Sequence, residues 1–318
     1  MRLIDGLDAL LALDLVASHG ETQQSRSVVS VGVFDGVHLG HQRLLHQLLE
    51  MSSALQAVPT VITFGNHPDQ VLHGKAPQLL VSVPHRQRLL WRAGVQRLVL
   101  LTFEPRLQNM TPREFAERVL VRSLRTRGLL LGYDSALGKD RTGTPQQFRE
   151  LGTELGFEVR TGTPFEVDGQ PVSSTSIRAA IARGDLALAH RNLGRFPGAL
   201  GTVVRGAQRG RTLGFPTANL VPLDAVLPPA GVYAVEAIVD GITFPAVANL
   251  GTRPTFQGSG SDVMLEVHIF DFEQDLYGRD LEVMFRQYLR LERRFEGVEQ
   301  LRRQIAQDIA QARACLKA

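Results

Sequence analysis

The stretch between Val28 and His41 constrains the fold of this chain more than any other part of the sequence. It opens with a valine-rich apolar run, as expected for a buried strand. Two glycines break the run, and His38 and His41 follow just before residues 42–51, whose leucines recur at the spacing of one helix face. A helix that begins at the end of a parallel strand presents free N–H groups and a partial positive charge. The stretch therefore predicts a phosphate-binding edge of an open α/β sheet.

The two histidines indicate which chemistry this edge supports. His38 and His41 are three residues apart at a helix start, so both can face one phosphate, and Gly40 lets the backbone approach it. Imidazoles and N–H groups around a phosphoryl centre suit nucleotidyl transfer, in which catalysis is mostly positioning and charge stabilisation. The alternative is a polar helix cap beside a turn. The string Gly-x-Phe-Asp-Gly-x-His-x-Gly-His from Gly32 onward resembles the signature of the nucleotidylyltransferase superfamily, in its flavin-adenylylating branch.

Strand-like and helix-like segments alternate through the first half of the chain, which predicts βαβ units around a parallel sheet. Asn66 and His67 directly follow one of these strands, so they are candidate ligand groups at the same edge of the sheet, although a lone loop histidine is usually only solvated. The expected strands are residues 1–5, 28–31, 57–64, 97–103, 128–134 and 157–160. The expected helices are residues 42–51, 83–93 and 111–127, and one that opens at Thr144-Pro145.

A second polar motif, residues 172–178, precedes another expected helix. Ser173, Ser174 or Thr175 can cap that helix, and Arg178 would lie in its first turn, where it could clamp a phosphate. Taken alone, a plain N-cap with an exposed arginine is the simpler interpretation. Nucleotidylyltransferases have a similar Ser-Ser-Thr-x-x-Arg element that holds the triphosphate. The resemblance therefore assigns this role to Ser174, Thr175 and Arg178.

After about residue 185 the pattern changes to strands separated by Gly/Pro turns, which is typical of a small β-barrel. The expected strands are residues 199–204, 231–239, 243–250, 263–270 and 281–288. Residues 297–317 return to helix, with one face formed by Leu301, Ile305, Ile309 and Ala310. The sequence thus predicts a Rossmann-like α/β domain over residues 1–185, followed over residues 186–318 by an antiparallel barrel with a C-terminal helix.

The segment 201–219 carries several glycines and arginines. It is not a Walker A loop, because the Gly-Lys-Ser/Thr ending is absent. Glycines nevertheless expose N–H groups that can cradle phosphate. Thr217 and Asn219 supply a hydroxyl and an amide oxygen, which Mg²⁺ accepts alongside nucleotide phosphates. The alternative is a glycine-rich hairpin without a ligand.

Several strings in the second half resemble the signature of riboflavin kinases. They are residues 214–219, 229–233, 249–256, 265–272, 275–278 and 289–292, with Phe295. They occur in the order of that family and cover residues 194–318. Together with the first domain, they make the whole chain resemble the bacterial bifunctional riboflavin kinase/FMN adenylyltransferase (FAD synthetase) family. The resemblance implies ATP-dependent phosphorylation of riboflavin to FMN, then adenylylation of FMN by ATP to FAD with release of pyrophosphate.

The resemblance also implies residue roles. Glu266 matches the general base that takes the proton of the riboflavin 5′-hydroxyl, although by itself it reads as a strand-face carboxylate in a salt bridge. Thr217 and Asn219 match ligands of the Mg²⁺–nucleotide, and Arg290 lies on the flavin side. His38 and His41 match the residues that stabilise the α-phosphate of ATP. The remaining candidates for ATP or phosphate are Gly32, Phe34, Gly206, Arg211 and Gly214, and those for flavin are Asn66, His67 and Asp134.

Two places depart from the family pattern. The family usually has Asp-Pro-His-Pro where this chain has Gly65-Asn-His-Pro68, and aromatic residues where this chain has Ser135 and Leu137. These positions shape the FMN and adenine pockets. An alternative function is therefore riboflavin kinase alone, with a weakened or silent adenylyltransferase domain.

Composition limits the other function classes. The net charge of +3 suits anionic small substrates. The sequence lacks the basic stripe with interleaved aromatic residues that would indicate nucleic-acid binding. No apolar run approaches a membrane span, and the acidic, leucine-containing N-terminus is not a signal peptide. The single cysteine, Cys315, excludes an internal disulfide. We therefore expect a cytoplasmic enzyme that acts on riboflavin, FMN and ATP with Mg²⁺, without nucleic acid, membrane or an obligate protein partner.

Overall fold

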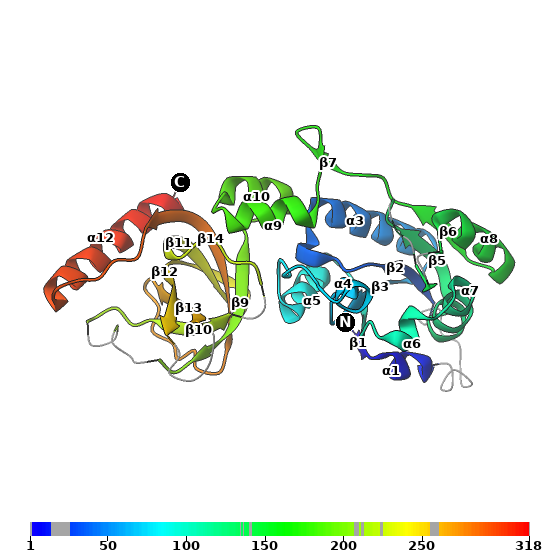
Figure 1. Cartoon of the computed structure of the whole chain (residues 1–318), viewed down its shortest axis with the longest axis horizontal. Coiled ribbons are helices and arrows are strands. Elements are labelled where there is room, and N and C mark those ends of the chain that lie inside the picture. The colour runs from blue at the N-terminus through cyan, green and yellow to red at the C-terminus, as the bar shows by residue number, and fades with distance from the viewer. Residues whose placement is uncertain are drawn as a thin grey trace. The chain divides into compact units, whose positions relative to one another are not determined.

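The structure is a computed structural model that describes residues 2–13, 26–133, 135, 137–139, 142–206, 210, 213–222, 225–254 and 261–317 (Figure 1). It contains two compact units. The first comprises Met1–Pro77 and Arg86–Val172, and the second comprises Gln78–His85 and Ser173–Ala318. The predicted domain boundary at residue 185 stays a prediction, but the packing assigns two further segments to the second unit, Gln78–His85 and residues 173–185.

The first unit is built on a parallel sheet of six strands in the order β1-β4-β3-β2-β5-β6, as predicted. The strands are β1 (Arg2–Asp5), β2 (Ser27–Val31), β3 (Val58–Phe64), β4 (Arg97–Leu101), β5 (Thr126–Leu131) and β6 (Glu158–Thr161). All five residues of β2 are buried, because helices cover both faces of the sheet at its centre. This explains why the central strands read as continuous apolar runs.

Helices connect these strands and carry the rest of the core. They are α1 (Leu7–Leu11), α3 (Leu39–Ala54), α4 (Pro68–His73), α5 (Val83–Arg92, of which Arg86–Arg92 belong to this unit), α6 (Pro105–Gln108), α7 (Pro112–Glu114) and α8 (Pro145–Leu155). The helix predicted over 111–127 is shorter than expected. Thr111 caps α7 with a capping box, the chain continues as a π-helix (η3, Phe115–Ser123), and β5 begins already at Thr126.

The second unit is centred on a closed six-stranded barrel in the order β10-β13-β12-β11-β14-β9, with antiparallel neighbours. Its strands are β9 (Gly198–Val204), β10 (Ala218–Pro222), β11 (Gly231–Val239), β12 (Ile242–Pro254), β13 (Ser261–Ile269) and β14 (Asp280–Arg290). The predicted barrel is confirmed, but β10 was not expected. It is a strand because β9 and β13 pair with it on both sides, which its short Ala-Asn-Leu-Val-Pro sequence does not reveal.

Helices α9 (Ser174–Ala182), α10 (Leu186–Leu193) and α12 (Val298–Lys317) complete this unit, together with the segment Gln78–His85. On α12 the predicted apolar face is partly wrong. Ala310 is exposed, whereas Asp308 and Ala312 are buried against the barrel. The buried carboxylate of Asp308 forms an ion pair with Arg290 of β14, so this helix face is not purely apolar. A small hairpin of the first unit, β7 (Glu166–Val167) and β8 (Gln170–Pro171), precedes α9 in the chain.

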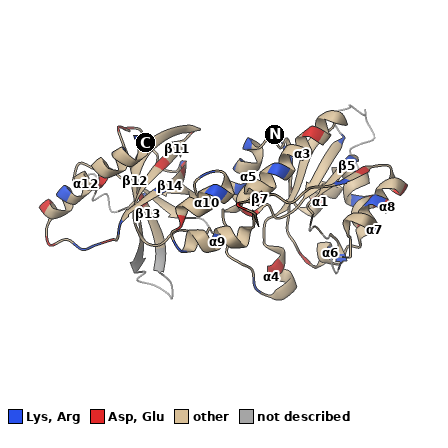
Figure 2. Cartoon of the chain, turned by 90° about the horizontal axis from the view of Figure 1, so that it is seen from above, with Lys and Arg blue, Asp and Glu red and all other residues tan. Residues whose placement is uncertain are grey.

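Acidic and basic side chains are interspersed on the elements of each unit (Figure 2). Several form exposed ion pairs, for example Arg113 with Glu154 at 2.6 Å between Nη2 and Oε2. Such pairs contribute little to stability. None of the helices in the described residues combines the length and the apolar character needed to cross a bilayer.

Candidate active sites

The predicted histidine pair lies at the start of α3. A short 3₁₀-helix, η2 (Asp35–Val37), separates it from the end of β2. His38 is the N-cap of α3, and its Nδ1 accepts a hydrogen bond from the backbone N–H of His41 at 3.3 Å. The two imidazole rings are stacked, with centroids 3.6 Å apart and planes 19° apart. The cap leaves only one arrangement for a neutral His38, because an accepting Nδ1 places the ring proton on Nε2. His38 is thereby prepared to donate from Nε2.

The backbone between the strand and these histidines is unusual. Phe34 and Val37 both have positive φ angles, of 51° and 42°, which are rare for residues with a side chain and above all for a β-branched one. The turn is closed by Gln42, whose Nε2 donates to the carbonyl of Val37 at 2.9 Å. A side chain at Gly40 would approach the His38 ring to 3.2 Å. A side chain at position 40 would therefore displace the His38 ring, and the turn before the helix adopts an unfavourable backbone conformation.

Phe34 and Gly32, both predicted to bind ATP, lie next to the histidine pair: Phe34 packs against His41, and Gly32 packs against Phe34. Phe34 is 2% exposed, and its ring centroid lies 5.1 Å from that of His41. Gly32 faces the Phe34 ring, where a Cβ would lie 3.2 Å from Cε2. In the structure these residues contact the site's own aromatic rings. Their contact with ATP stays a prediction.

Burial sets the charge of His41. Burial first, then the neighbouring His38 and then Arg86 lower the pKa of His41 well below its ordinary value of 6.5. His41 is therefore neutral near neutral pH, with one ring nitrogen that donates and one that accepts. A neutral donor next to a capped donor can hydrogen-bond phosphate oxygens, while the helix N-terminus supplies N–H groups and partial positive charge.

Asn66 and His67 lie past the end of β3, as predicted. The Asn66 amide is engaged on both sides by Phe103: its Nδ2 donates to the carbonyl at 2.9 Å, and its Oδ1 accepts from the N–H at 2.7 Å. His67 caps α4, where its Nδ1 accepts from the backbone of Asp69 at 3.2 Å. Both residues thus fix the loops at this sheet edge. Their contacts with flavin stay predictions, and Asp134 lies outside the described residues.

The Ser-Ser-Thr motif begins α9 in the second unit. Ser173 is the N-cap, and its hydroxyl accepts from the N–H of Ser176 at 3.2 Å. Ser174 and Thr175 are the first two helical residues. Arg178 is the fifth, so it lies beyond the first turn rather than within it as expected. Its Nε donates to the carbonyl of Gln78 at 2.7 Å, and its role as a phosphate clamp stays a prediction.

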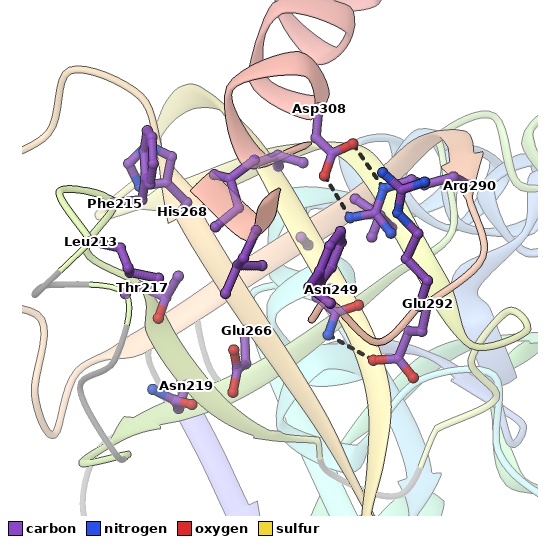
Figure 3. Close-up of a pocket in the computed structure, with 18 residues that line it drawn as sticks. Leu213, Phe215, Thr217, Asn219, Asn249, Glu266, His268, Arg290, Glu292 and Asp308 are labelled. Carbon is purple, nitrogen blue, oxygen red and sulfur yellow. Dashed lines mark hydrogen bonds and ion pairs between the residues drawn. The ribbon is translucent and has the colours of Figure 1, made fainter. Parts of the chain in front are cut away.

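Three polar side chains lie side by side on three neighbouring strands of the barrel in the second unit. Asn219 of β10 pairs with Glu266 of β13, and Glu266 pairs in turn with Asn249 of β12. On β13 the alternate residues Leu265 and Val267 are buried in the barrel core, so Glu266 faces away from it. The register therefore gathers two amides around one carboxylate (Figure 3).

This row lines a cavity of about 350 Å³. Thr217 borders it and also borders a second cavity of about 420 Å³ beside Asp275 and Tyr277. A hydroxyl shared by two neighbouring cavities can contact groups bound in both. Arg205 stacks on the ring of Tyr277, with its guanidinium 5.3 Å from the ring centroid.

Two glycines let the loop before β10 approach these side chains. A Cβ on Gly206 would lie 2.5 Å from the Asn219 amide, and one on Gly210 would lie 3.2 Å from the hydroxyl of Thr217. Gly214 adopts a positive φ of 87° in the turn that follows. The hydroxyl and the amide form a hard oxygen set that fits Mg²⁺ shared with phosphate. The predicted phosphate ligand Arg211 lies outside the described residues.

The other wall of the first cavity is closed by ion pairs and hydrogen bonds that the sequence did not predict (Figure 3). Arg290 binds Asp308 of α12 in a bidentate pair: Nε donates to Oδ1 at 2.9 Å, and Nη2 donates to Oδ2 at 2.7 Å. Glu292 accepts from Asn249 Nδ2 at 2.7 Å. Arg290 thus lines this cavity, while its predicted contact with flavin stays a prediction. The available signal for Asp308 was a carboxylate on an otherwise apolar helix face.

Comparison with known proteins assigns each unit to a family. The FAD synthetase family model matches residues 20–176, and the riboflavin kinase model matches residues 193–316. A bifunctional riboflavin kinase/FMN adenylyltransferase from Pseudomonas fluorescens is 39% identical over 287 residues, which cover 90% of this chain and 92% of the relative. The chain belongs to the bifunctional riboflavin kinase/FMN adenylyltransferase family. The family member from Escherichia coli (strain K12) is 37% identical over 98% of this chain and 97% of its own length.

A solved structure named as a macrolide-efflux protein from Streptococcus pneumoniae resembles this member of the family, with a TM-score of 0.77 and 33% identity over 92% of this chain and 95% of that one. The family predicted from the motifs is confirmed. His38 and His41 fall within the part matched by the FAD synthetase model, whereas Glu266 and Asn219 fall within the riboflavin kinase part. The two clusters of polar residues thus coincide with the two family models.

Proposed function

We propose that this chain makes FMN from riboflavin at the Asn219–Glu266–Asn249 row and converts FMN to FAD at the histidine pair. The observation that carries the proposal is that each family model contains one cluster suited to its reaction. The barrel has a carboxylate between two amides beside a cavity. The α/β unit has two stacked imidazoles at a helix N-terminus.

In the kinase reaction, Glu266 accepts the proton of the riboflavin 5′-hydroxyl as that oxygen attacks the γ-phosphorus of ATP. A new O–P bond forms, the bond to the β-phosphate oxygen breaks, and ADP leaves. We assign riboflavin to the first cavity, where Arg290 and apolar side chains of α12 lie, and ATP to the second. Thr217, at the border of both, is suited to hold the transferring phosphoryl group.

Thr217 and Asn219 would hold Mg²⁺ together with the nucleotide phosphates, an assignment supported by their hard oxygen atoms and by the close approach of Gly206 and Gly210. The ion would neutralise charge that develops on the phosphate oxygens. The protein's own contribution is orientation. The Asn219 and Asn249 amides flank Glu266 in the strand register, and all three residues line the cavity.

In the adenylylation reaction, a phosphate oxygen of FMN attacks the α-phosphorus of ATP, and pyrophosphate leaves as the bond to the β-phosphate breaks. The attacking oxygen is already anionic, so no general base is needed. His38 and the neutral His41 donate hydrogen bonds to the α-phosphate oxygens as negative charge develops on them. Ser174, Thr175 and Arg178 would bind the β- and γ-phosphates that become pyrophosphate.

One assay tests both assignments. The full chain is incubated with riboflavin, ATP and Mg²⁺, and the flavins are separated by chromatography. We expect wild type to yield FMN and FAD, His41→Asn to stop at FMN, and Glu266→Gln to form FAD only when FMN is supplied. His46→Asn is the matched control, because His46 lies on the same helix with 61% of its side chain exposed. If His41→Asn and Glu266→Gln each lose both activities while still folded, the two-site assignment is wrong.

A wild-type product mixture that ends at FMN would instead favour the kinase-only alternative, which the departures at Gly65, Asn66, Ser135 and Leu137 leave as the second candidate. We also propose a cytoplasmic location, since ATP is a substrate of both reactions and Cys315 is a free thiol. Fractionation of cells that produce the chain would test it.

A further inference from the structure

Arg86 is a charged residue to which the reactions above give no role, although it is buried next to the histidine motif. It belongs to α5 and is 1% exposed. Its Nη1 donates to the carbonyl of Val33 at 3.0 Å, and its Nη2 donates to the carbonyl of Phe64. These carbonyls lie at the carboxyl ends of β2 and β3, which are neighbours in the sheet. The guanidinium therefore ties together the edge from which the histidine turn departs.

Burying a guanidinium is costly, and a neutral amide could satisfy the same two carbonyls. Burial lowers the pKa of Arg86 to about 10, while the carboxylate of Asp35 opposes this change. Arg86 therefore keeps its positive charge near neutral pH. Its Nε is buried without a hydrogen-bond partner within the described part of the chain. A charge retained under these conditions indicates an electrostatic task in addition to the structural one.

The first route from Arg86 to the histidines is the backbone. The carbonyl of Val33 accepts from Arg86 and also from the hydroxyl of Thr63 at 3.0 Å. The next residue, Phe34, is the left-handed residue whose ring lies 5.1 Å from His41. Rotation of the peptide after Val33 would therefore displace the ring that supports His41. The two hydrogen bonds prevent this rotation.

The second route is the electrostatic field. Three causes lower the pKa of His41, namely burial, His38 on its own helix and Arg86 from α5. Asp35, in the turn between the strand and the histidines, acts on Arg86 with the opposite sign. A positive charge destabilises a protonated imidazole, so Arg86 helps to keep His41 neutral. Removal of that charge should make His41 easier to protonate.

We propose that Arg86 is a positioning residue for adenylyl transfer, which sets the geometry of the His38–His41 turn through its two backbone hydrogen bonds and the field at His41 through its charge. The inference rests on the proposed adenylyl transfer at these histidines. It adds a residue that is distant in sequence, lies on another helix and need not touch either substrate.

The test compares three variants of the full chain. Arg86→Gln removes the charge but keeps neutral donors, and Arg86→Lys keeps the charge but loses the two-pronged contact. Arg97→Gln is the matched control, because Arg97 is a second arginine of the same unit whose pKa is lowered by burial, and it lies on β4. The readouts are kcat and KM for FAD formation from FMN, and the titration of the His41 Cε1–H signal by NMR. The His41→Asn spectrum assigns that signal.

In Arg86→Gln we expect the pKa of His41 to rise by at least about 0.5 units. We expect kcat to fall by about 10- to 100-fold, as for loss of an oriented electrostatic contribution, with KM for FMN changed by less than about threefold. Arg86→Lys should keep the pKa of His41 near the wild-type value and restore part of kcat. Arg97→Gln should change neither quantity.

An unchanged pKa of His41 and an unchanged kcat in Arg86→Gln would overturn the inference. The same shift in Arg97→Gln would also overturn it, because it would then reflect the loss of any buried arginine. If Arg86→Gln does not fold, Arg86→Lys decides: a wild-type kcat would exclude the two-pronged positioning. Failure of the proposed function looks different, since wild type itself would then form no FAD from FMN.

Discussion

The ion pair between Arg290 and Asp308 joins helix α12 to the barrel at the wall of the 350 Å³ cavity, and its removal should lower the stability of the second unit. Asp308→Asn keeps the shape of the side chain but removes its charge, and an amide N–H group would then face the guanidinium. The exposed fractions of the two side chains are 22% for Arg290 and 5% for Asp308. Breaking a buried pair from one side costs about 3–5 kcal/mol, and we expect about 3 kcal/mol because Arg290 is partly hydrated.

The same helix offers a matched control. Arg313 of α12 contacts Asp271 with two distances of 2.9 Å, but 39% and 77% of these side chains are exposed. Asp271→Asn should therefore cost less than about 1 kcal/mol. The two substitutions remove the same kind of charge from the same helix–barrel contact. The two pairs differ mainly in burial, and Asp308 also accepts a hydrogen bond from Gln304 Nε2 at 2.8 Å, so the larger loss is expected for Asp308→Asn.

Each unit can be followed separately during urea unfolding. Hydrogen exchange of peptides from β12 to β14 and α12 reports on the second unit, and the single tryptophan, Trp91, reports on the first. With a slope of about 2 kcal/mol per molar urea, Asp308→Asn should lower the midpoint of the second unit by about 1.5 M and leave the Trp91 transition unchanged. Equal midpoint shifts for Asp308→Asn and Asp271→Asn would refute the reasoning from burial.

Four further outcomes follow from single contacts. Thr111→Ala removes the capping box of α7 and should lower the free energy of unfolding of the first unit by about 1 kcal/mol, measured by Trp91 fluorescence. Gly251→Ala would place a Cβ against the Glu292 carboxylate and should raise KM for riboflavin in the kinase assay. Thr217→Val should reduce kinase kcat by about 100-fold, as for loss of one oriented polar contact, and leave FAD formation from FMN intact. Because the pKa of His41 is lower in the folded than in the unfolded state, the unfolded state binds more protons below pH 6.5. The first unit should then lose up to about 1.4 kcal/mol per pH unit as the pH falls below that value, a slope that His41→Asn removes.

The sequence predicted the parts of the fold that depend on local pattern. Strands β2 and β3 were recognisable because both their faces are buried, which produces continuous apolar runs. Strand β10 was not, because five residues that include Asn219 and Pro222 carry too little pattern, and pairing with two distant strands decides their conformation. The π-helical turn after α7 was equally hidden, since its apolar spacing also fits an α-helix.

The site was predictable to a similar depth. The motifs pointed to His38, His41, Glu266 and Asn219, because each of these residues lies in a compact string that resembles a family signature. They could not reveal which strand register aligns Glu266 with both amides, since register depends on the closed barrel. The packing of Gln78–His85 with the second unit could not be predicted from the sequence either. It is held by contacts across long sequence separations, such as the bond from the N–H of Val226 to the carbonyl of Leu79 at 2.8 Å.

Buried charges mark what the motifs leave out. Asp308 and Arg86 each lie on a helix, away from any glycine-rich string, and both residues are buried. Neither position needs a charge to fill space, since an uncharged side chain of similar size would be less costly to bury. Both instead contact residues of the two proposed sites: Asp308 binds Arg290, which lines the 350 Å³ cavity, and Arg86 donates to the carbonyl of Val33, which precedes the histidine turn. In these two cases, a charged residue on an apolar helix face lies next to a proposed site. Burial raises the free-energy cost of such a charge, and it also strengthens the electrostatic interactions that the charge makes.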